Sequence, residues 1–168
     1  MIVGVLFAGM MPWRSAASPA LDQVGTPAAE ITGDLSPNEQ AEADELAETT
    51  IKSVCVTCHP VENIIRVRRE QADWARVITT MATVGAKATP DQFRMIRRYL
   101  TRYYGVIRVN RAAAEEFSAV LGYVPKDAAA IVAYRQAHGP FTDVEALAQA
   151  PGLDRTRLDD QPLALKFD

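Results

Sequence analysis

Two cysteines and a histidine in the stretch from Cys55 to His59 are the residues whose types and spacing most directly point to chemistry. They read Cys55-Val56-Thr57-Cys58-His59 and include the only two cysteines of the chain. A C-x-x-C-H sequence is typical of the covalent attachment of a c-type haem. Each thiol would add to one vinyl group of the porphyrin, and the imidazole of His59 would be the proximal ligand of the iron.

Two other chemistries use a cysteine pair at this spacing. A redox-active dithiol of the thioredoxin kind is expected in a βαβ setting, which the sequence around Cys55 does not suggest. A structural zinc site needs four ligands at metal spacing, and the only histidine besides His59 is the distant His138. We therefore predict haem attachment at Cys55 and Cys58 and keep a redox dithiol as the alternative.

Length and charge distribution limit the organisation of the chain. Its 168 residues, nearly half of them apolar, are enough for one medium domain or two small ones. Residues 1–54 contain two basic and eight acidic side chains, residues 55–105 contain nine and four, and residues 106–168 contain seven and nine. The segment with the C-x-x-C-H sequence is therefore basic, and the C-terminal third is slightly acidic.

The N-terminal residues have the pattern of an export signal. An apolar run at residues 2–11 is followed by proline and small residues, which suits cleavage after Ala17 or Ala20. No Lys or Arg precedes the run, and a bilayer span takes about 20 apolar residues. We predict a signal at residues 1–20, an acidic flexible linker at residues 21–36, and no transmembrane span in the mature chain. An uncleaved anchor is the alternative.

The residues before Cys55 form a helical pattern that leads the chain to the first thiol. Ser36, Pro37 and Glu39 are typical of a helix start with a capping box and with proline at the first helical position. We expect this helix to continue through residues 39–54. Its apolar stripe comprises Ala43, Leu46, Ala47, Thr50, Ile51 and Val54.

Two longer helices are predicted after the C-x-x-C-H sequence. The first covers about residues 74–84, with Asp73 as its cap. The second opens at Thr89, which is followed by proline, and continues to residue 104, before Gly105.

Residues 37–105 resemble a small class I cytochrome c domain, in particular the short bacterial ones. The resemblance implies that the first and last helices cross and bury the haem edge. It also implies that a methionine after the C-x-x-C-H sequence closes the sixth coordination position of the iron. The matching elements are Cys55–His59, Ile65-Arg66, Trp74 to Met81, Gly85-Ala86 and Tyr99-Leu100.

This resemblance makes Met81 the candidate distal ligand, so that the expected metal ligands are His59 and Met81. A thioether is a neutral ligand that raises the reduction potential relative to a second histidine. Two alternatives remain: Met81 as ordinary core filler, and Met95 as the ligand, although the family places packing residues in the last helix. Only 21 residues separate His59 from Met81, so the loop below the haem must be short.

Three arginines and a tryptophan between these ligands are further candidates. Arg66, Arg68 and Arg69 would pair with the haem propionates or form a docking face for a redox partner, and a solvated face is the alternative. Trp74 is expected to pack against the haem or the core.

Residues 107–168 resemble the tandem helix-hairpin-helix domain of bacterial competence DNA receptors. We expect helices that end at Leu121, cover residues 127–137 and cover residues 143–149. The resemblance rests on Val109-Asn110, Gly122-x-x-Pro125-x-x-Ala128-x-x-Ile131-x-x-Tyr134-Arg135, Gly139-x-Phe141 and Pro151-Gly152-Leu153.

In that family each hairpin reads Gly-hydrophobic-Gly, and backbone N–H groups at the second glycine and the next helix start hold a DNA phosphate. Here Val124 and Asp154 stand at the second glycine positions, and non-specific DNA binding depends on basic charge, which this segment lacks. We expect the fold to be kept for protein docking or for stability, with nucleic-acid binding through residues 107–168 as the alternative. His138, before Gly139, is expected to cap its helix.

The sequence thus predicts an all-α protein, with a cytochrome c domain at residues 37–105 and a helix-hairpin-helix domain at residues 106–168. The expected function is electron transfer in the periplasm, or otherwise outside the cytoplasm, by one covalently bound heme c. A periplasmic dehydrogenase is a candidate redox partner. With His59 and Met81 on the two axial positions, we expect no catalytic site. The alternatives are an exported DNA-binding protein with a structural or sensory haem, and a haem enzyme with an open sixth position.

Overall fold

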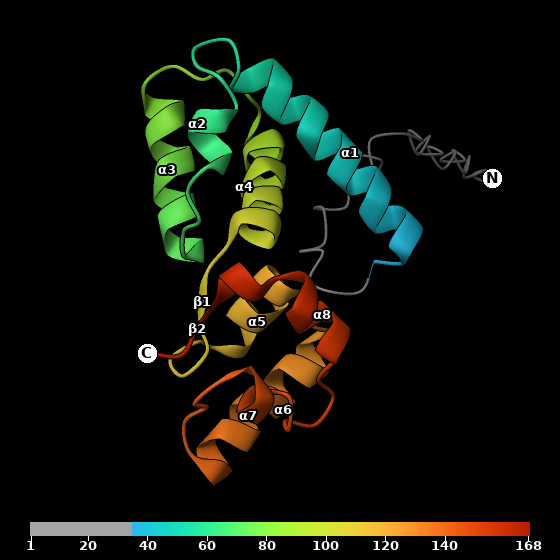
Figure 1. Ribbon diagram of the computed structural model, residues 1–168. Coiled ribbons are helices and arrows are strands. Elements are labelled where there is room, and N and C mark those ends of the chain that lie inside the picture. The colour runs from blue at the N-terminus through green and yellow to red at the C-terminus, as the bar shows by residue number, and fades with distance from the viewer. Residues whose placement is uncertain (1–34) are drawn as a thin grey trace, which may run out of the picture. The chain divides into compact units, whose positions relative to one another are not determined.

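The computed structural model describes residues 35–168, which belong to one compact unit. Helices make up most of this region and the strands are only two residues long (Figure 1), which confirms the predicted all-α class. Within residues 35–168 no helix is both long enough and apolar enough to cross a membrane. The predicted export signal at residues 1–20 and nearly all of the predicted linker lie outside the described residues.

Helix α1 (Pro37–Val54) begins as the sequence predicts. The Ser36 hydroxyl accepts the Glu39 N–H, and the Glu39 carboxylate accepts the Ser36 N–H, so the capping box is complete. The buried residues of α1 all belong to the predicted apolar stripe. One member of that stripe, Leu46, is 54% exposed. Leu46 is rotated about 100° from Ala47 around the helix, beyond the face that the rest of the fold covers.

Helices α2 (Glu62–Ile65), α3 (Gln71–Thr83) and α4 (Pro90–Tyr104) follow. The start of α4 is as predicted, with a complete capping box between Thr89 and Gln92. Helix α3 starts earlier than predicted, with Glu70 as its N-cap residue, and Asp73 lies in its first turn. The chain leaves α4 at Gly105 in an extended conformation, and the position requires glycine because a Cβ atom there would collide with the Thr101 carbonyl oxygen.

The C-terminal residues form a second group of short elements. Strand β1 (Ile107–Arg108) pairs in parallel with β2 (Leu165–Lys166), so the end of the chain returns beside Ile107. The elements between them are α5 (Ala114–Leu121), α6 (Pro125–His138), α7 (Val144–Leu147), α8 (Arg155–Asp160) and the 3-10 helix η1 (Pro162–Ala164). The predicted helices are confirmed in position, with α6 starting two residues earlier and α7 ending two residues earlier.

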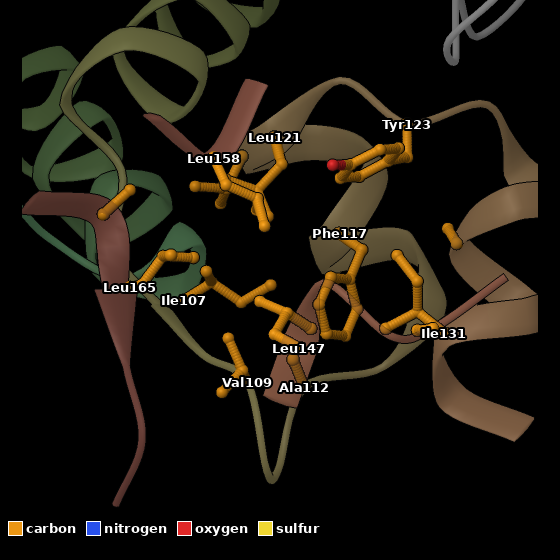
Figure 2. Packing of buried hydrophobic residues seen from close by; sticks show 14 of the residues in the cluster. Ile107, Val109, Ala112, Phe117, Leu121, Tyr123, Ile131, Leu147, Leu158 and Leu165 are labelled. Atoms are coloured by element: carbon orange, nitrogen blue, oxygen red, sulfur yellow. The ribbon is translucent and has the colours of Figure 1, made fainter. Parts of the chain in front are cut away.

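Two apolar cores stabilise the unit. The core of the C-terminal part, which we define as residues 106–168, contains Phe117, Ile131, Leu147 and Leu158, all at most 1% exposed (Figure 2). The core of the N-terminal part, residues 35–105, is smaller. Its buried members are Ile51, Val54, Trp74, Ile96 and Leu100.

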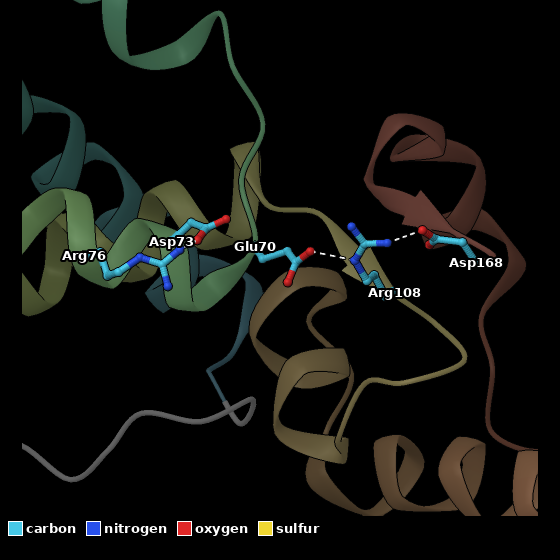
Figure 3. Close-up of polar contacts among 5 residues, drawn as sticks. All are labelled: Glu70, Asp73, Arg76, Arg108 and Asp168. Atoms are coloured by element: carbon cyan, nitrogen blue, oxygen red, sulfur yellow. Dashed lines mark hydrogen bonds and ion pairs between the residues drawn. The ribbon is translucent and has the colours of Figure 1, made fainter.

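Backbone pairing joins the two parts. The Arg69 N–H donates to the Tyr104 carbonyl at 3.1 Å, and the Val106 N–H donates to the Arg69 carbonyl at 2.9 Å. Next to this backbone pairing, the Arg108 guanidinium forms ion pairs with Glu70, at 2.7 Å, and with Asp168 (Figure 3). Because Glu70 is the N-cap residue of α3, these contacts fix the start of α3 against the C-terminal part.

The Asn110 side chain joins three segments of the C-terminal part, and its substitution tests this contact. Its Oδ1 accepts the Phe141 N–H at 2.8 Å, and its Nδ2 donates to the carbonyls of Phe141 and Phe167 at 2.9 and 3.0 Å. Asn110→Ala leaves the backbone of the buried Phe141 without these partners, so we expect a loss of about 2–3 kcal/mol in the free energy of unfolding. Urea unfolding measures this loss.

The matched control is Asn63→Ala, at an exposed position of α2, which should change the free energy of unfolding by less than about 0.5 kcal/mol. An equal effect of the two substitutions would contradict this role of Asn110.

Candidate functional site

The two thiols lie where α1 ends. Cys55 is the C-cap residue of α1, and its N–H donates to the Ile51 carbonyl at 2.8 Å. A turn follows, in which the Cys58 N–H approaches the Cys55 carbonyl at 3.5 Å. Cys55 is half-buried against the smaller core, whereas Cys58 is exposed, and both thiols are free. The pair therefore presents two separate sulfur atoms at the edge of an apolar core.

The alternatives to haem attachment are less well supported by this geometry. Burial raises the pKa of the Cys55 thiol, whereas a reactive dithiol needs a thiol whose pKa is lowered. Among residues 35–168 no three His, Cys, Asp or Glu side chains are grouped so that they could hold a metal ion. Cys55, Cys58 and His59 therefore do not converge on one point as zinc ligands would. Attachment to separate atoms of a porphyrin needs no such convergence.

His59 is oriented by the residue that follows it. Its Nδ1 lies 3.2 Å from the Pro60 carbonyl oxygen. When Nδ1 carries the proton and donates it to this carbonyl, Nε2 keeps its lone pair for a metal. A backbone carbonyl commonly orients a metal-binding histidine in this way.

Helix packing places Met81 at the same end of the N-terminal part as these residues. The Tyr99 hydroxyl donates to Glu48 at 2.8 Å, and Tyr103 donates to Asp44, so α1 and α4 run antiparallel. At the same end of α4 as Tyr103, the Trp74 Nε1–H donates to the Tyr104 carbonyl at 3.0 Å, so α3 begins where α4 ends. The end of α1, the end of α3 and the start of α4 therefore lie together (Figure 1).

The two candidate methionines have different surroundings. The Met95 sulfur lies 3.9 Å from the Thr50 hydroxyl oxygen, within the packing of α4 on α1. Met81 is half-buried in the last turn of α3 and borders an open hollow of about 390 Å³. Met81 therefore borders open space, but Cys55, Cys58 and His59 do not line this hollow. The hollow is also lined by Arg69, Asp73, Arg76, Val77 and Thr80.

Apolar side chains surround the small core without being fully buried, and their chemistry fits an attached porphyrin. Cofactor sites are lined mainly by apolar and aromatic side chains with a few polar groups. Two thiols, an oriented imidazole and a thioether at one end of three helices are the donors that a c-type haem needs. The partly buried apolar residues of this part include Val61, Ile64, Val77, Ile78, Ala86, Ala88 and Phe93.

The predicted arginines are mostly engaged within the fold. Arg68 donates to the Gly105 carbonyl at 3.3 Å, and the Arg69 guanidinium lies 5.6 Å from the centre of the Trp74 ring. Arg66, at the end of α2, is the exposed member of the three. Trp74 is 1% exposed and packs in the core, which confirms the prediction.

Two hairpins with the predicted spacing occupy the C-terminal part. Gly122 (φ +70°) and Gly152 (φ +77°) adopt the left-handed conformation that their turns require. In the first hairpin, Val124 stands at the second glycine position and is the N-cap residue of α6, without a side-chain cap. In the second hairpin, Asp154 stands at this position, and its carboxylate accepts the Thr156 N–H at 3.0 Å. His138 ends α6, with Nδ1 3.0 Å from the Tyr134 carbonyl, which suits its predicted capping role.

Comparison with known proteins agrees with this part of the structure. A family model of the helix-hairpin-helix motif matches residues 103–160. No solved structure matches the chain. The C-terminal part therefore contains a helix-hairpin-helix motif. Arg102 of α4 and Arg157 of α8 contact the first hairpin turn, which contains Gly122. The sequence does not indicate this contact, because no local pattern connects the three segments.

The α1–α4 contact that positions the thiols should weaken in alkali. Burial, together with donation to Asp44, raises the pKa of Tyr103 from 10.0 to about 12. A pKa that is higher in the folded state gives stability that is complete below about pH 10 and is lost as pH rises through about 12. Tyr103→Phe should therefore reduce the fall in the urea midpoint between about pH 9 and pH 12.

Part of the alkaline loss should persist in that variant, because burial also raises the pKa of Tyr123 to about 12. Identical pH profiles for the wild type and Tyr103→Phe would contradict this account of the α1–α4 contact.

Proposed function

We propose that this protein is an exported one-electron carrier, a monohaem cytochrome of the c type. Cys55 and Cys58 would hold the haem through thioether bonds, His59 would be the proximal ligand, and Met81 would be the distal ligand. The observation that carries the proposal is the C-x-x-C-H sequence at the end of α1, with both thiols free and His59 Nδ1 directed at the Pro60 carbonyl. Export would follow from the predicted signal at residues 1–20.

The roles of the side chains follow from their chemistry. When bound, the haem would supply a reversible one-electron iron couple, whose potential a neutral thioether raises relative to a second imidazole. The two cysteines would keep the group from dissociating, and donation from Nδ1 to the Pro60 carbonyl would hold His59 in the tautomer that leaves Nε2 free for the iron. The partly buried apolar residues around the small core would exclude water from the bound group. With both axial positions filled, the iron would have no open position for a substrate, so we propose a carrier and not an enzyme.

The partner of such a carrier would be another redox protein, with a periplasmic dehydrogenase as the candidate. The charge distribution supports this, because residues 55–105 contain nine basic and four acidic side chains. Charge complementarity mainly speeds the encounter of two proteins, so the rate of electron exchange should fall as salt is added.

The helix-hairpin-helix match at residues 103–160 favours a second candidate function, a DNA-binding protein whose haem is structural or sensory. We propose docking or stability as the role of this module, because the C-terminal part is slightly acidic and the start of α8 is capped by Asp154. Tight, salt-sensitive binding of duplex DNA in a fluorescence anisotropy titration would favour the second candidate.

The thioether bonds are tested by counting them in protein that is matured in a host able to attach haem. The wild type should contain one haem per chain, with the pyridine spectrum of a group attached at two points. Cys55→Ala and Cys58→Ala should each shift the visible band to longer wavelength, because one vinyl group stays unreacted. The control Thr57→Ala should leave the band unchanged. A colourless wild-type protein would refute the proposal.

The distal ligand is tested with a pair of methionine variants. Met81→Ala should abolish the weak near-infrared sulfur-to-iron band of the oxidised protein and let carbon monoxide bind the reduced protein at least about 100-fold faster, since the sixth position is then open. Met95→Ala should keep the band, because its sulfur packs near Thr50. The reverse result would identify Met95 as the ligand, and no change in either variant would leave a haem enzyme as the better proposal.

A further inference from the structure

An arginine of α4 fills the first hairpin turn of the C-terminal part. The Arg102 guanidinium lies against Gly122, where an added Cβ atom would be 2.5 Å from the Arg102 Cζ. Its Nη1 donates to the Val120 carbonyl at 3.1 Å. Two features therefore require glycine at position 122: its positive φ, and the close approach of the Arg102 side chain.

A second arginine closes the same turn from α8. Arg157 Nη1 donates to the Gly122 carbonyl, and the guanidinium lies 5.6 Å from the centre of the Tyr123 ring. The Tyr123 hydroxyl in turn donates to the Asp154 carbonyl at 3.0 Å, which ties the first hairpin to the second. Tyr123 is 2% exposed, whereas the Arg157 side chain is 43% exposed, so the buried ring lies beneath a partly exposed arginine.

The chemistry of the turn suits a guanidinium. The last carbonyls of a helix have no partner within the helix and carry partial negative charge, and Val120 and Gly122 stand at the end of α5. A planar group with several donors can satisfy such carbonyls and stack on a neighbouring aromatic ring at the same time. Burial lowers the pKa of Arg102, and the proximity of Arg157 lowers it further, so the contacts must compensate for a desolvated charge.

We propose that the first hairpin turn is a binding site for the Arg102 side chain of the chain's own α4. The C-terminal part then acts as a binding partner of the N-terminal part, and the Val120 and Gly122 carbonyls of the turn are occupied by Arg102 and Arg157. The second turn is closed in a related way, since Asp127 covers Gly152, where an added Cβ atom would be 2.9 Å from the Asp127 Oδ1. This inference does not depend on whether a haem is attached.

The contact has a structural consequence for the rest of α4. Tyr103, the next residue, donates to Asp44 of α1, and Tyr104 provides the carbonyl that Arg69 and Trp74 bind. The hairpin therefore holds the same turn of α4 that α1 and α3 contact. Loosening the Arg102 contact should loosen this turn of α4 together with the hairpin.

Hydrogen exchange of the full chain tests the proposal with three variants. Arg102→Met keeps the apolar stem and removes the donors, so amide exchange at residues 118–124 and in the last turn of α4 should speed up by about tenfold or more. Arg102→Lys keeps the charge but lacks the planar guanidinium, so its amide exchange rates should be closer to those of Arg102→Met than to those of the wild type. The control Arg97→Met, at an exposed position of α4, should exchange like the wild type.

Unchanged exchange in Arg102→Met, or full recovery by Arg102→Lys, would overturn the proposal. If Arg102→Met does not fold, Arg102→Gln, which keeps an amide donor, replaces it with the same criteria. Anisotropy with duplex DNA at low salt gives an independent readout. Binding by the wild type that both Arg102→Met and Arg157→Met weaken would identify the turn as a phosphate site and refute the proposal.

Discussion

The carbonyl oxygen of Tyr104, the last residue of α4, is the acceptor on which the arrangement of the N-terminal part depends. It receives the Arg69 N–H and the Trp74 Nε1–H, so the start of α3 is fixed to the end of α4. One turn earlier, Tyr99 and α1 fix the other side of the same helix. Because α4 is held from both sides, the ends of α1 and α3 are brought to one end of the part, where Cys55 and Met81 lie.

The same helix connects the two parts of the unit. Arg102 enters the first hairpin turn, and Gly105 allows the chain to turn into β1, which pairs with the last strand of the chain. The larger core lies in the C-terminal part, and the smaller core lies beside the proposed attachment site. In this arrangement the C-terminal part, with its larger core, supports helices whose own buried core is small.

The local features of the fold could be predicted from the sequence, whereas its long-range contacts could not. The capping boxes at Ser36 and Thr89 follow from residue types three positions apart, and both are present. The start of α3 was misplaced because it is set by pairing between Arg69 and Gly105, which are distant in sequence. Pattern alone places the two thiols and His59 together. The position of Met81 depends on packing between helices, which no short stretch of sequence encodes.

The intact mass of protein matured in a host able to attach haem, taken before and after extraction with acidified acetone, tests the central claim most directly. The account predicts a mature chain heavier by one haem, whose pigment stays with the protein through the extraction. A chain of bare polypeptide mass, or a pigment that passes into the acetone, would contradict covalent attachment at Cys55 and Cys58.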